Sequence, residues 1–63
     1  MRMAIEAPAW LIRDCAEIAL RKENQVKLGE TVTFPSPYIK EYWFDITKAE
    51  DETIIVIARE KSH

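Results

Sequence analysis

The sequence predicts a single α+β domain over residues 1–63, in which one N-terminal helix packs on a small three-stranded antiparallel sheet in the order α-β-β-β. Three patterns predict this fold. Apolar residues recur with a helical period in 8–24, they alternate with polar residues in 26–34, and β-branched apolar residues run together in 53–58. A chain of this length buries only roughly 60% of its unfolded surface, so we also expect association to stabilise it.

The N-terminal elements are a short extended segment and the helix. Residues 1–6 alternate apolar and polar side chains, which fits either an edge strand or an ordered lead-in. The helix is predicted over 8–24, with Pro8 in the first turn, where its missing N–H group is no loss. Its apolar side chains span roughly 200° of the helical wheel, about twice the stripe that one packing surface requires. We therefore expect this helix to be covered on two sides.

Two strands are predicted in the middle of the chain. Residues 26–34 carry apolar side chains at 26, 28, 32 and 34, and Gly29-Glu30 interrupts them as a turn or bulge. The strand is predicted over 30–34 and ends at Pro35-Ser36-Pro37. Residues 38–47 fit a strand, but they also fit a helix capped by Ser36. The strand is favoured because 42–47 is rich in aromatic and β-branched residues, which pack well on a pleated sheet. The alternative, with two helices and one strand, would form an intertwined dimer.

The last strand, 53–58, is apolar on both faces. A single helix can cover only one of them, so it protects either Ile54 and Val56 or Ile55 and Ile57. Exposing two isoleucines costs on the order of 3–6 kcal/mol, comparable to the whole stability of a small domain. We therefore expect a homodimer, most simply one with twofold symmetry. In the alternative, the N-terminal segment folds across the second face.

Composition limits the partners and the compartment. Nine Lys and Arg residues against eleven Asp and Glu give a net charge of −2, with the charges scattered along the chain. That balance argues against duplex nucleic acid and against an anionic membrane as partners. No apolar run approaches the ~20 residues that span a bilayer, and Arg2 and Glu6 interrupt the start of the chain where a signal peptide would be apolar. We expect a cytoplasmic protein.

No residue pattern predicts a catalytic, cofactor or metal site, so we expect a protein that is not an enzyme. His63 ends the chain, where backbones are usually poorly ordered. Cys15 lies on the apolar arc of the helix, where cysteine acts as a small hydrophobe. The acidic cluster Glu50-Asp51-Glu52 is expected on a polar loop, without the spacing of a calcium loop. An enzyme whose site forms between subunits stays a third alternative.

A weaker pattern points to nucleic acid. Arg21, Lys22 and Lys27 form the only basic grouping, and with Trp43 or Tyr38 on an open sheet face they could form a platform for single strands. Arg21 and Lys22 also suit the carboxyl end of a helix, where the macrodipole favours cations. A small dimeric nucleic-acid-binding regulator is therefore the alternative function.

Five residues are predicted to form interfaces. They are Trp10, Tyr38, Trp43, Ile55 and Ile57. Trp10 falls among charged residues on the helical wheel, and tryptophan is enriched in contact surfaces. We expect a homodimeric regulatory or inhibitory protein that binds another protein, through a sheet face that the pattern does not identify. In composition the chain resembles small acidic accessory proteins of phages and other mobile elements, a resemblance that implies binding to the surface of a host protein.

Overall fold

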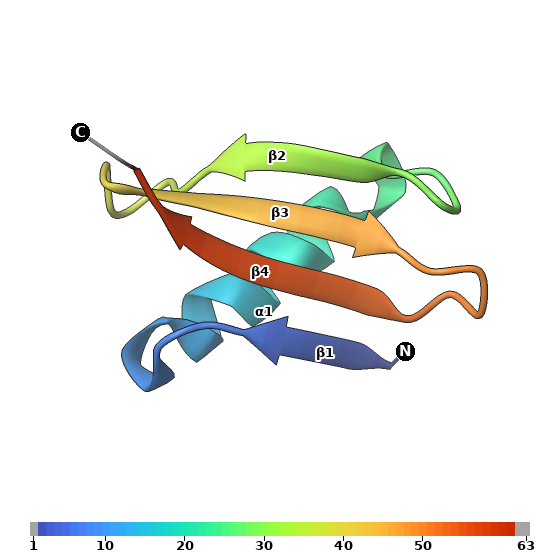
Figure 1. Cartoon of the computed structure of the whole chain (residues 1–63), viewed down its shortest axis with the longest axis horizontal. Helices are drawn as coiled ribbons and strands as arrows, with labels where there is room; N and C mark the ends of the chain where they lie inside the picture. Colours follow the sequence, from blue (N-terminus) through green and yellow to red (C-terminus); the bar gives the residue numbers. More distant parts are fainter. Residues whose placement is uncertain (1, 62–63) are drawn as a thin grey trace.

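The structure, a computed structural model, describes residues 2–61 and has one helix against one face of a four-stranded sheet (Figure 1). Helix α1 (Ile12–Lys22) crosses the sheet diagonally. The strands are β1 (Met3–Glu6), β2 (Thr31–Pro35), β3 (Tyr42–Lys48) and β4 (Ile54–Glu60), and their order in the sheet is β1-β4-β3-β2. The predicted α+β class is confirmed.

The predicted sheet of three antiparallel strands was wrong in one respect, because the sheet has a fourth strand and is mixed. Strands β2, β3 and β4 pair antiparallel, as the sequence indicated. Strand β1 joins them parallel to β4, with Met3 opposite Ile54 and Glu6 opposite Ile57. This pairing satisfies backbone groups that β4 would otherwise expose at an edge. It leaves the face of β4 that carries Ile55 and Ile57 uncovered, since β1 lies in the plane of the sheet.

The helical region closely follows the predicted 8–24. Pro8 precedes a 3-10 turn at Ala9–Leu11, α1 follows directly, and a second 3-10 turn covers Glu23–Gln25. The expectation that the helix is covered on two sides was wrong: Ile12 is 45% exposed and Leu20 is 60% exposed. Only one sheet face meets the helix, so the far part of its wide apolar arc stays on the surface. In residues 2–61 no helix has the length and the apolar content to cross a membrane.

The core lies between α1 and the sheet face that α1 covers. Phe44 and Ile46 of β3 are fully buried there, next to Val56 of β4. The remaining buried residues are Leu11, Cys15, Ile18, Ala19, Val26 and Ile54. Since neighbours along a strand point to opposite faces, burial of these residues leaves the alternate residues of every strand on the other side.

The ambiguous segment is a turn followed by a strand. Strand β3 begins at Tyr42, so the favoured strand is confirmed and the alternative of two helices with one strand was wrong. The Ser36 hydroxyl accepts hydrogen bonds from the backbone N–H groups of Tyr38 at 3.3 Å and Ile39 at 3.0 Å. Ser36 therefore caps a single turn, which ends when the Tyr42 N–H group donates to the Ile39 carbonyl at 3.2 Å. The Ser36 cap that suggested a helix therefore precedes one turn only, and the chain does not continue as a helix after it.

Candidate interaction surfaces

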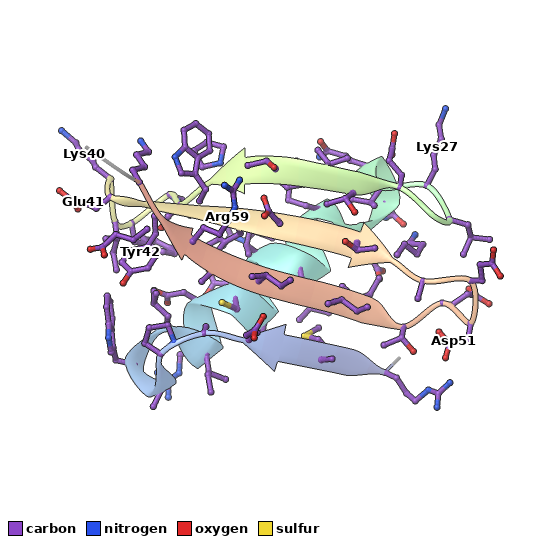
Figure 2. The ribbon with its side chains drawn as sticks, in the orientation of Figure 1. Lys27, Lys40, Glu41, Tyr42, Asp51 and Arg59 are labelled. Carbon is purple, nitrogen blue, oxygen red and sulfur yellow. The ribbon has the colours of Figure 1, made fainter. Side chains whose placement is uncertain are left out.

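The sheet face opposite α1 has no layer over it within residues 2–61, and we call it the open face (Figure 2). The strand register arranges its side chains in three rows across the strands. The rows are Ala4, Ile55, Thr47 and Thr31; then Glu6, Ile57, Asp45 and Thr33; then Arg59, Trp43 and Pro35. The β1–β4 side of the open face is therefore mainly apolar, and the β2–β3 side carries mainly threonines.

Ile55 and Ile57 form the centre of the apolar side. Both are half-buried by their neighbours in the sheet, whereas Ile54 and Val56, which alternate with them along β4, are at most 1% exposed in the core. The alternative in which the N-terminal segment folds across this face was wrong, because β1 lies beside β4 in the plane of the sheet (Figure 1). No segment of residues 2–61 therefore packs over these two isoleucines.

Asp45, Arg59 and Thr33 form a hydrogen-bonded group in the middle of the open face. Arg59 donates from Nε to Oδ2 of Asp45 at 2.6 Å and from Nη2 to Oδ1 at 3.0 Å. The Thr33 hydroxyl donates to Oδ1 at 2.6 Å. The Arg59 hydrogen bonds lower the pKa of Asp45 despite its partial desolvation, and the pKa of Arg59 is raised in return. Asp45 therefore stays ionised and engaged, which does not suit a general acid or base.

Trp43 lies at one end of the open face, directly opposite Arg59 in the register. The Lys61 ammonium group sits 4.6 Å from the centroid of the indole ring, a cation–π contact. A hollow beside the ring is lined by Thr33, Trp43, Arg59, Glu60 and Lys61. Trp43 thus extends the surface of Ile55 and Ile57 toward a charged rim, while Lys61 already occupies one side of its ring.

The other two predicted interface residues lie elsewhere, near the end of the molecule where β3 begins. Trp10 is 60% exposed and meets the Tyr42 ring edge to face, with the centroids 5.7 Å apart. Tyr38 is 57% exposed, and its hydroxyl donates to Oε1 of Glu17 at 2.7 Å. That hydrogen bond raises the pKa of the Tyr38 phenol. Figure 2 shows Tyr42 at this end, beside Lys40 and Glu41 of the connecting turn.

The five predicted interface residues therefore occupy two surfaces. Trp43, Ile55 and Ile57 share the open face, whereas Trp10 and Tyr38 belong to the end of the helix layer. Sequence reasoning missed the pairing of Asp45 with Arg59. The signal was present, because opposite charges two positions apart in neighbouring antiparallel strands can meet diagonally, but reading it required the strand register.

The remaining reactive side chains have structural surroundings. Cys15 is a buried free thiol, and burial raises its pKa, which disfavours the nucleophilic thiolate. Asp51 accepts a hydrogen bond from the Thr53 N–H group at 3.0 Å, which lowers its pKa, and it pairs with Arg2 at 2.8 Å. No group of three or more potential metal ligands occurs in the part of the chain that the structure describes, and His63 lies outside that part.

Comparison with known proteins identifies no relative of this chain. No protein-family model matches the chain, and no curated protein and no solved structure shows a significant match to it.

Proposed function

We propose that this chain is a non-enzymatic regulatory or inhibitory protein that forms a homodimer through the open face and acts by binding another protein. The observation that carries the proposal is the position of Ile55 and Ile57, which are half-buried on a sheet face that no described segment covers. Closing that face with a second copy removes the remaining exposed part of both side chains from water. The gain for each isoleucine is a fraction of the roughly 1.5–3 kcal/mol for full burial of an exposed side chain, because each is already half-buried.

The layout of the open face suits pairing with itself. Ala4, Ile55 and Ile57 form an apolar centre, and polar or charged side chains surround it, as in most interfaces. The internal pairing of Asp45 with Arg59 leaves neither charge to be buried alone when the faces meet. In a twofold dimer each patch packs against its own copy, so no second complementary surface is needed.

The dimer is expected to dissociate into folded monomers. Each copy already has its own core between α1 and the sheet, so folding does not depend on the partner. Four strands about 4.8 Å apart, of which the longest, β3 and β4, have seven residues, give a face of at most roughly 19 by 24 Å. That area is below the ~800 Å² per partner of a standard interface. We therefore expect a dissociation constant in the micromolar range.

The exposed aromatic residues supply a separate surface for another protein. Trp10 and Tyr38 lie away from the open face, so they remain accessible in a dimer that pairs through the sheets. Tyrosine and tryptophan are the residue types that most often dominate binding energy. A cytoplasmic location remains part of the proposal, since the chain has one cysteine and a reducing compartment would keep its thiol free.

The residues of the open face support binding to nucleic acid less well than binding to protein. Lys61 occupies one side of the Trp43 ring, and Asp45 engages Arg59. Stacking of a base is therefore limited to the other side of the ring, and binding of a phosphate by Arg59 competes with its ion pair. Titration of the tryptophan fluorescence with a single-stranded oligonucleotide tests this alternative. Saturable quenching that weakens steeply with added salt would favour it over the protein-binding proposal.

A pair of matched substitutions tests the dimer. Ile57→Lys places a charge in the middle of the apolar centre, whereas Leu20→Lys places the same charge on an exposed apolar residue of α1. Because neither side chain lies in the core, both variants should fold. We expect Ile57→Lys to be monomeric at concentrations where Leu20→Lys and the original chain are dimeric. Equal masses for the two variants would contradict the assignment of the interface to the open face.

A further inference from the structure

A groove lies between α1 and the end of β2, at the edge of the sheet. Its volume is about 300 Å³, at the lower end of the range for ligand pockets. Ile18, Phe34 and Pro37 contribute apolar surface to it, and most of its lining is apolar. The groove therefore has room for one large apolar side chain.

One cation at this groove, Lys22, makes no ion pair with an acidic side chain of residues 2–61. Glu17 already binds Arg21 at 3.2 Å and accepts the Tyr38 hydroxyl at 2.7 Å. The Lys22 ammonium group lies 5.5 Å from the centroid of the Phe34 ring, over the apolar surface of the groove. An uncompensated positive charge thus adjoins an apolar hollow.

We propose that this groove binds an apolar side chain adjacent to a carboxylate, within an acidic segment of a partner protein. An aromatic or aliphatic side chain would pack on Phe34 and Ile18, and the neighbouring carboxylate would pair with Lys22. The inference extends the proposed protein-binding function by naming the chemistry of the partner. It does not depend on the dimer, because the groove lies between α1 and the edge strand β2, whereas Ile55 and Ile57 lie on β4.

Nuclear magnetic resonance titration with short blocked peptides provides the test. The probe is the tetrapeptide glycine–phenylalanine–aspartate–glycine, compared with peptides that carry asparagine in place of aspartate or alanine in place of phenylalanine. We expect the probe to shift the amide signals of residues 18, 22, 34 and 36, which line the groove and have N–H groups. The asparagine peptide should bind about three- to fivefold more weakly, as expected for one exposed ion pair.

Two lysine variants locate the charge. Lys22→Gln should weaken the aspartate peptide to the level of the asparagine peptide, whereas Lys27→Gln, an exposed lysine at the far end of the molecule, should change nothing (Figure 2). Equal affinity for the aspartate and asparagine peptides would overturn the proposal. So would tighter binding of free 3-phenylpropionate than of the peptide, since that result indicates a site for small acids.

The outcomes also separate this inference from the proposed function. If the aspartate peptide shifts the signals of Trp43, Ile55 and Ile57 in place of the groove signals, the groove assignment is wrong, and the open face binds a partner segment where the proposed function places a second copy. If the peptide binds in the groove and the chain is monomeric at every concentration, the groove stands and the dimer does not.

Discussion

Arg59 binds the carboxylate of Asp45 through two hydrogen bonds, 2.6 Å from Nε to Oδ2 and 3.0 Å from Nη2 to Oδ1, in the middle of the open face. The two residues lie diagonally across β3 and β4, because Arg59 is directly opposite Trp43 and Asp45 is directly opposite Ile57. A bidentate pair of this kind fixes both side chains. The two paired charges lie on the same sheet face as Ile55 and Ile57.

This pair should make stability depend on pH. The Arg59 hydrogen bonds lower the pKa of Asp45 in the folded state, so the unfolded chain binds the extra proton first as the solution is acidified. The contribution of Asp45 is therefore complete above its unfolded pKa of about 4 and is lost as the pH falls through the lower folded value. We expect the difference in unfolding free energy between the original chain and Asp45→Asn to shrink below about pH 4, measured by urea unfolding.

The same measurement in an Arg59→Gln background provides the control. Without the guanidinium group, Asp45→Asn should have a smaller effect at neutral pH and a weaker dependence on pH. If the effect of Asp45→Asn in the original chain stayed constant from about pH 7 to about pH 2, the role assigned to the pair would be contradicted.

The loop between β3 and β4 contains a strained position. Glu52 has a φ of 69°, the only positive φ among the described non-glycine residues, and its N–H group donates to the Ala49 carbonyl at 2.8 Å. Glycine adopts this conformation without a steric penalty. We expect Glu52→Gly to stabilise the fold by about 0.5–1 kcal/mol and Glu50→Gly in the same loop to destabilise it slightly, measured by thermal unfolding. Destabilisation by both to the same extent would refute the strain at Glu52.

The core should respond to the loss of a single methylene group. Ile46 is fully buried between the sheet and α1, whereas Ile12 is 45% exposed on the helix. Ile46→Val should lower the free energy of unfolding by about 1 kcal/mol, because it leaves a small void. Ile12→Val should change it by less than about 0.5 kcal/mol. Equal effects of the two substitutions in denaturant unfolding would mean that the core is not where the structure places it.

The thiol of Cys15 should be inert while the protein is folded. It is fully buried in the core, and burial raises its pKa, so little thiolate forms and reagents cannot reach the sulfur. We expect an aromatic disulfide reagent at about pH 8 to react with the folded chain at least about 100-fold more slowly than with the chain in guanidinium chloride. Rapid stoichiometric labelling of the folded protein would instead indicate an accessible, reactive thiol.

Local patterns predicted most of the secondary structure. Pro8 and the apolar period located the helix, and the β-branched run at 54–57 located β4. These signals depend on residues close together in the chain, so they can be read without the fold. The sequence also predicted that the helix covers one face of β4 and leaves the other uncovered, because a single helix can protect only one face.

Contacts between segments far apart in the sequence were harder to predict. The pairing of β1 with β4 joins residues that are far apart in the chain, such as Met3 and Ile54, and nothing in the local pattern of 3–6 indicates a parallel neighbour. The exposed side of α1 was predicted wrongly for the same reason: Ile12 and Leu20 fit a covered helix, but residues 2–61 place only the sheet against it. The separation of Trp10 from Trp43 likewise required the three-dimensional arrangement.

The proposal that Ile55 and Ile57 pack against a second copy is tested most directly by the mass of the unaltered chain in solution. Light scattering over concentrations from about 5 to about 500 μM should show a rise from near the 7.4 kDa of one chain toward twice that value, with no larger species. A mass of one chain at every concentration, with cooperative unfolding, would contradict the dimer and leave the open face as the surface of a stable monomer.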